Sequence, residues 1–230
     1  MTTLTRNHAD LALEVKAHIE ADALVRGEYW DGSKGCFIGC LTHSSDPEPA
    51  VERFGLPEPL LRIAESIFEA LPDEEGQAFF AALPDAVGCD GKDLSKVHWA
   101  FLAAELRLLP QHECINTVIA GMDLLVAGGE WSIDAAYDAY AASDAASAAA
   151  YTANAAYAAY AAACTARAAD AAADTAYAAA RASDYSARSS DYTARAADHS
   201  ARASDYAAAR IRQRDSLLEI IKQAPMGDQA

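Results

Sequence analysis

Apolar residues recur at helical spacing through most of the first 129 residues. The pattern predicts a first helix, capped by Asn7 or Asp10, that runs to about Arg26. Further helices are expected over LLRIAESIFEAL after Pro57 and Pro59, over EEGQAFFAAL from Asp73, over LSKVHWAFLAAELRLL up to Pro110, and over ECINTVIAGMDLLVA up to Gly128 and Gly129. The last is apolar on most faces, which predicts a central helix. Pro47 and Pro49 indicate a short turn that ends at Gly55. No stretch alternates like a strand, so residues 1–129 are predicted to form an all-helical domain of roughly five to seven helices.

The rest of the chain has a different pattern. From Glu130 to Ala224 it contains neither glycine nor proline, and alanine is by far its most frequent residue. Alanine is the best helix former, whereas glycine and proline stop helices. Residues 130–224 are therefore predicted to form a very long, coiled-coil-like helix or a helical hairpin, with residues 225–230 as a disordered tail. The expected fold class is all-α.

A seven-residue repeat, RASDYSA, RSSDYTA, RAADHSA and RASDYAA, covers Arg181 to Ala208. Its small residues share one side of a helix, and the same side continues beyond the repeat into larger apolar residues. This side is predicted to be buried by helix packing at Ala187, Ala194, Ala201, Ala208, Ile211, Leu218 and Ile221. The heptad phase slips by one residue between Asn154 and Tyr157. Two arrangements fit this slip: a chain that folds back on itself, or a homo-oligomer, expected to be a dimer, with a locally overwound coiled coil.

The opposite side of the repeat alternates aromatic and cationic residues: Tyr185, Arg188, Tyr192, Arg195, His199, Arg202 and Tyr206. Interleaved aspartates neutralise this stripe, which argues against nucleic-acid binding. Tyrosine and arginine dominate the energetics of protein interfaces, so the stripe favours a protein partner. The alternative is a solvated side of a coiled coil.

Charge and cysteine content narrow the function further. Residues 1–130 carry 22 acidic and 9 basic side chains, a net charge of −13, which argues against direct nucleic-acid binding. Polar residues interrupt the alanine tract every few positions, so no membrane span is expected. The first residues do not have the pattern of a signal peptide. The odd number of cysteines, 5, suggests free thiols and a cytoplasmic location.

The densest group of reactive side chains lies in the segment WDGSKGCFIGCLTH. On a helix, Cys36, Cys40 and His43 would share one face, with Gly35 and Gly39 beside them. These three side chains are candidates for a zinc site completed by Cys89, His98, His112 or Cys114, or for a nucleophilic or redox thiol. The third interpretation, and the favoured one, has no cofactor: the glycines let another helix approach, and the thiols act as small apolar groups. No catalytic residue is assigned.

Three segments together, WDGSKGCFIGCLTH, FGLPEPLLRIAESIFEALP and the closing RQRDSLLEIIK, resemble an uncharacterised family of bacterial and phage proteins. Its members typically carry a KGCxxGCxxH segment, an iFexLP segment and a tail rich in alanine, tryptophan and tyrosine. This chain has tyrosine where such tails often have tryptophan. The resemblance covers most of the chain and implies no known chemistry.

Together these patterns predict a non-enzymatic protein-interaction module with an acidic helical head and a long helical rod. The phage resemblance implies that the partner is a host macromolecule, such as a defence protein that this chain inhibits. Whether the acidic head mimics nucleic acid stays open. The alternatives are a structural homo-oligomer built through the rod, and an enzyme or small-ligand binder centred on Cys36, Cys40 and His43.

Overall fold

A computed structural model describes residues 4–109, 113–132, 134–136, 138–139 and 206–227 of the chain. Regular structure in these residues is helical, and strand-like pairing is limited to isolated bridges. The helices whose bounds lie within these residues are α1 (His8–Glu20), α2 (Phe37–Thr42), α3 (Glu48–Phe54), α4 (Glu58–Ala70), α5 (Asp73–Val87), α6 (Val97–Arg107), α7 (Glu113–Val126) and α11 (Tyr206–Gln223). The all-α prediction is confirmed for the described part. Most of the predicted long helix or hairpin lies outside it.

The chain divides into two compact units, which differ from the division predicted after residue 129. The first unit comprises Met1–Val97 and Arg214–Ala230, and the second comprises His98–Gln213. The end of the chain belongs to the first unit through backbone hydrogen bonds. Asp93 N–H donates to the Pro225 carbonyl at 2.9 Å, and Gly227 N–H donates to the Gly91 carbonyl at 2.8 Å. Residues 225–227, predicted to begin a disordered tail, are therefore paired with a loop of the first unit.

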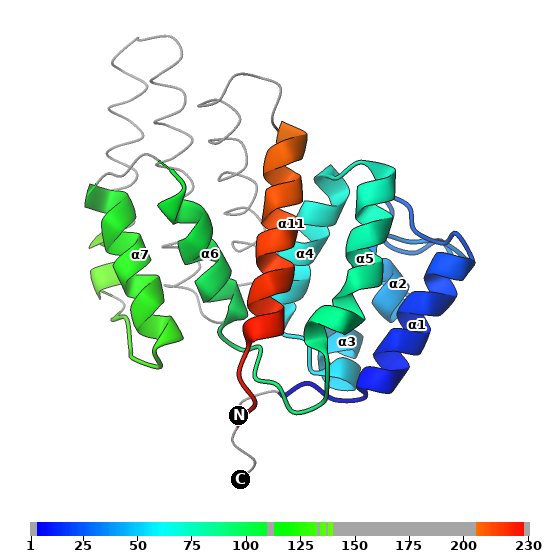
Figure 1. Ribbon diagram of the computed structural model, residues 1–230, viewed down its shortest axis with the longest axis horizontal. Helices are drawn as coiled ribbons and strands as arrows, with labels where there is room; N and C mark the ends of the chain where they lie inside the picture. The colour runs from blue at the N-terminus through cyan, green and yellow to red at the C-terminus, as the bar shows by residue number, and fades with distance from the viewer. Residues whose placement is uncertain (1–3, 110–112, 133, 137, 140–205, 228–230) are drawn as a thin grey trace. The chain divides into compact units, whose positions relative to one another are not determined.

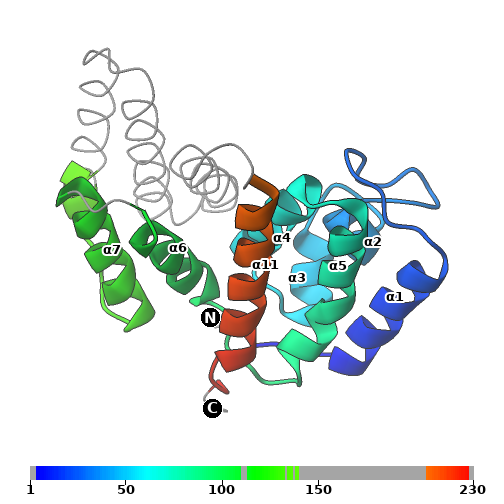
Figure 2. The ribbon, with the colours of Figure 1, turned by 45° about the horizontal axis from the view of Figure 1, so that its top comes forward.

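Phe37, at the start of α2, lies at the centre of the core of the first unit. Its side chain is fully buried, and its ring lies 6.1 Å from that of Phe68 on α4 and 5.1 and 5.2 Å from those of Phe79 and Phe80 on α5. Helix α1 packs along α5, and α2 contacts α1, α3 and α4 (Figures 1 and 2). Burial of these rings, worth about 1.5–3 kcal/mol each, fixes α2 among its neighbours.

Helix boundaries follow the proline and glycine signals in part. Pro57 precedes α4, as predicted, because its fixed φ suits a helix start. The predicted turn from Pro47 to Gly55 is wrong, because those residues form α3. Gly55 ends that helix with a φ of 68°. Helix α1 ends at Glu20 and not at Arg26, and Asp22 in the loop after it has a φ of 49°.

Within the second unit, α7 is not buried on all sides, contrary to the prediction of a central helix. Ile115, Val118 and Met122 are buried, whereas Asn116, Thr117, Ala120, Asp123 and Leu124 are exposed. Gly121 is needed for packing, because a Cβ there would lie 2.3 Å from the Trp131 ring. The predicted end of α7 is confirmed, since Gly128 has a φ of 84°. None of the described helices combines the length and hydropathy needed to cross a bilayer.

The buried side of α11 is offset from the predicted heptad positions. Ala208 is exposed, Ile211 and Leu218 are half-buried, and only Ile221 among the predicted packing residues of this helix is fully buried. The buried residues also include Ala209, Arg210, Gln213 and Leu217. Two of these buried residues are polar, and Arg210 Nη1 donates a hydrogen bond of 2.9 Å to Gln213 Oε1, as buried polar groups require. Ala187, Ala194 and Ala201 lie outside the described residues.

Candidate metal site

Gly35 and Gly39 let the backbone of Tyr29 lie directly against α2. A Cβ on Gly39 would lie 1.3 Å from the Tyr29 carbonyl oxygen, and a Cβ on Gly35 would lie 2.1 Å from it. The close approach expected at these glycines is therefore real, but it comes from the loop before α2 and not from another helix. This contact also positions Trp30, the next residue of that loop.

The thiols of Cys36 and Cys40 are buried and hydrogen-bonded to backbone carbonyls. Cys40 Sγ donates to the Gly35 carbonyl at 3.3 Å, and Cys36 Sγ donates to the Tyr29 carbonyl at 3.9 Å. Burial raises the pKa of both thiols, that of Cys40 to about 12. Because the thiolate is the nucleophile and the metal-binding form, this environment favours the interpretation of the thiols as small apolar groups.

Next to Cys36 lie two carboxylates, Glu65 and Glu69, with ligand atoms of all three within 4.8 Å of one another. Each carboxylate already accepts a backbone hydrogen bond at 2.8 Å, Glu65 from Ile38 N–H and Glu69 from Gly27 N–H. Burial raises the pKa of Glu65 to about 7. These contacts join α4 to α2 and to the loop before it, so we assign them to folding.

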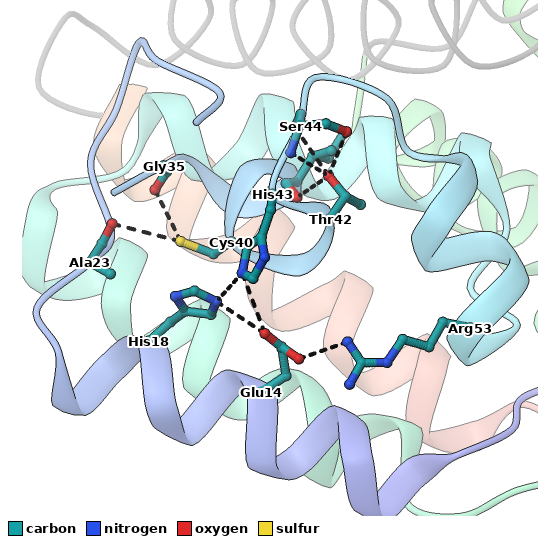
Figure 3. Close-up of polar contacts among 10 residues, drawn as sticks. Glu14, His18, Ala23, Gly35, Cys40, Thr42, His43, Ser44 and Arg53 are labelled. Atoms are coloured by element: carbon teal, nitrogen blue, oxygen red, sulfur yellow. Dashed lines mark hydrogen bonds and ion pairs between the residues drawn. The ribbon is translucent and has the colours of Figure 1, made fainter. Parts of the chain in front are cut away.

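A second cluster joins α1 to the end of α2. Glu14 and His18 lie one turn apart on α1, and His43 ends α2 in the left-handed region with a φ of 55°. The Nε2 atoms of the two histidines are 3.1 Å apart. Glu14 Oε1 lies 3.3 Å from His18 Nε2 and 3.5 Å from His43 Nε2. Figure 3 shows the three side chains pointing toward one another.

Two further side chains hold this cluster in place. Arg53 Nη1 donates to Glu14 Oε2 at 2.7 Å, which leaves Oε1 directed at the histidines (Figure 3). The Trp30 ring stacks on the His43 ring with centroids 4.4 Å apart and meets the His18 ring edge-on at 5.5 Å. Such outer contacts fix the orientation of metal ligands in known sites.

The separations in this cluster match those between the ligands of one tetrahedral metal ion. Two nitrogen atoms that each bind zinc at about 2.0–2.1 Å lie about 3.3 Å apart when the angle at the metal is tetrahedral. The distances of 3.1, 3.3 and 3.5 Å fall around this value. Burial lowers the pKa of His18, with the His43 charge acting in the same direction and Glu14 opposing both. The neutral imidazole that results is the form that binds metals.

Of the three predicted site residues, only His43 belongs to this cluster. The His43 ring lies with Glu14 and His18 because α2 ends there and the chain turns, so Cys36, Cys40 and His43 do not act as one helical face. Of the proposed fourth ligands, Cys89 is exposed and His98 is buried on α6. His112 and the side chain of Cys114 lie outside the described part.

Glu14 and His18 were not predicted. Their signal was a Glu-x-x-x-His spacing in the first expected helix, which places both side chains on one face. The aromatic and cationic stripe from Tyr185 to Arg202 lies outside the described residues, as does the side chain of Tyr206, so the predicted protein interface stays a prediction. Comparison of the chain with protein families, with curated proteins and with solved structures found no match.

Proposed function

We propose that this protein binds one divalent transition metal ion through Glu14, His18 and His43. The observation that supports this most directly is the mutual spacing of three potential ligand atoms, which lie 3.1 to 3.5 Å from one another. Two imidazoles and a carboxylate suit zinc, cobalt, nickel or copper, whereas magnesium and calcium prefer oxygen ligands alone. Zinc is the expected ion, because its tetrahedral geometry fits these distances.

Three protein ligands would leave the fourth tetrahedral position to water or to an added ligand. Zinc sites with three protein ligands and an open position are typical of catalysis, whereas structural zinc sites are closed by four protein ligands. The proposed function is therefore a metal centre that exchanges its fourth ligand.

Metal titration of the full-length protein tests this proposal. We expect one zinc ion per chain, and a loss of affinity of about 100-fold or more in His43→Ala, which removes a ligand, and in Glu14→Gln, which replaces a carboxylate with a neutral and weaker ligand. His43 is half exposed, with a side-chain exposure of 52%, so its truncation leaves the core intact.

Two controls separate this site from the alternatives. His8→Ala removes a histidine that lies on α1, as Glu14 and His18 do, but that contacts the Pro84 carbonyl. This variant should bind zinc like the wild type. Cys40→Ala should also retain binding. The proposal fails if zinc does not bind stoichiometrically, if His43→Ala binds it unchanged, or if Cys40→Ala alone abolishes binding.

A further inference from the structure

The solvent-facing edge of the metal site is formed by His43 and Arg53. The side chains of His18 and Glu14 are 11% and 18% exposed, whereas those of His43 and Arg53 are 52% and 45% exposed. An open coordination position on a metal held by these three ligands would therefore face the side where His43 and Arg53 lie. A ligand that enters from solvent meets the guanidinium and the metal together.

The charges at this edge favour an anion. A divalent ion bound by one carboxylate and two neutral imidazoles keeps a net charge of +1 by valence, and Arg53 adds a second positive charge beside it. Arg53 uses Nη1 to hold Glu14 Oε2, and a guanidinium has five N–H donors in a planar fork that suits oxyanions.

We infer that the open position takes a small oxyanion, with one oxygen on the metal and a second oxygen accepting a hydrogen bond from Arg53. This inference rests on the proposed metal site and names the class of its exchangeable ligand. Arg53 has two roles in it: it orients Glu14 as a metal ligand, and it binds the incoming anion. Carboxylate and phosphate groups share this chemistry and differ in shape, planar against tetrahedral.

Cobalt substitution makes the fourth ligand visible, because the visible absorption of Co²⁺ depends on its coordination. The full-length protein is saturated with Co²⁺ and titrated with inorganic phosphate or with acetate at constant ionic strength. We expect a saturable spectral change with at least one of the two anions, and the tighter of them identifies the preferred shape.

Arg53→Gln tests the second contact, in samples that are again saturated with Co²⁺. We expect anion affinity about 10-fold lower or more in this variant, because a charge-assisted hydrogen bond is lost. Arg26→Gln, which removes an arginine paired with Asp73 elsewhere in the first unit, should leave anion affinity unchanged.

The outcomes separate the two proposals. Absence of Co²⁺ binding overturns the metal site and this inference with it. Bound Co²⁺ whose spectrum neither anion changes overturns the inference alone and leaves the metal site standing. Equal anion affinity in the wild type and in Arg53→Gln shows that the anion binds without Arg53. That result overturns the proposed arrangement, in which one anion oxygen binds the metal and a second accepts a hydrogen bond from Arg53.

Discussion

The Glu65 carboxylate on α4 accepts a hydrogen bond of 2.8 Å from the backbone N–H of Ile38, in the first turn of α2. His43 is the residue that follows the other end of α2, so this contact anchors the short helix that positions one ligand of the proposed metal site. The Glu65 side chain is buried, with an exposed fraction of 9% for the residue. A carboxylate is favoured at a helix N-terminus, but burial raises its pKa from 4.5 to about 7.

This raised pKa predicts that stability depends on pH. Between pH 4.5 and about 7 the folded protein binds more protons at Glu65 than the unfolded chain does. The free energy of unfolding should therefore fall as the pH rises through this window, by about 3 kcal/mol from this residue. Glu65→Gln keeps an oxygen to accept the Ile38 N–H and removes the titration. Denaturant unfolding at pH 5 and pH 8 should show that the free energy of unfolding of the variant, relative to that of the wild type, is higher at pH 8 than at pH 5.

Glu52→Gln is the matched control, because Glu52 is an exposed carboxylate on α3. Its stability difference from wild type should change little between the two pH values. A Glu65→Gln variant that follows the wild-type pH profile would show that the carboxyl is not held in its raised-pKa environment.

The close contact between Gly39 and Tyr29 predicts that Gly39→Ala is strongly destabilising. The added Cβ would lie 1.3 Å from a backbone oxygen, so the loop before α2 must move. We expect a loss of about 3 kcal/mol in the free energy of unfolding, at the upper end for overpacking. Gly76→Ala on α5 is the control, since the nearest atoms to its Cβ would be those of the Phe68 ring at 3.2 Å, and the Phe68 backbone oxygen would be 3.9 Å away. That variant should stay within about 1 kcal/mol of wild type.

Buried thiols predict a reactivity order among the described cysteines. Native alkylation followed by mass spectrometry should modify Cys89, which is exposed, about 100-fold faster or more than Cys36 and Cys40. In denaturant all three should react at similar rates. Fast alkylation of Cys36 or Cys40 in the native protein at neutral pH would instead favour the enzyme alternative with a nucleophilic thiol.

Most of the longer helices could be predicted from the sequence, because they have strong apolar periodicity and are bounded by proline or glycine. The start of α4 after Pro57 and the end of α7 at Gly128 are examples. The failures occur where local pattern gives way to tertiary contacts. The helix α3 looked like a turn because it is short and follows Pro47, and the buried side of α11 includes Arg210, which no hydrophobic pattern would select.

The candidate site was only partly predictable for the same reason. His43 was nominated with Cys36 and Cys40 because these residues are neighbours in sequence. Its observed partners, Glu14 and His18, come from α1, and His18 precedes His43 by 25 positions in the sequence. Periodicity places Glu14 and His18 on one face, but only the packing of α1 against α2 brings that face to His43.

The Lys92 ammonium joins the ends of two helices in the first unit. Its Nζ donates to the carbonyls of Lys222 at 2.7 Å and Ile221 at 3.3 Å, near the end of α11, and to that of Ala86 at 3.4 Å, near the end of α5. A cation at two helix C-termini satisfies carbonyls that lack helical partners and interacts favourably with both helix dipoles. We expect Lys92→Met, which keeps much of the aliphatic chain, to lower the free energy of unfolding by about 1–2 kcal/mol.

Hydrogen exchange distinguishes this role from a general surface effect. Lys92→Met should increase amide exchange in the last turn of α11 and at Gly227, whose N–H is bonded to the Gly91 carbonyl next to Lys92. Lys96→Met removes an exposed lysine from the same loop and should change neither stability nor exchange there. If both variants exchange alike, Lys92 does not hold the end of the chain on the first unit. In that case the backbone pairing at 225–227 and the packing of Leu217 and Ile221 must be enough to keep it there.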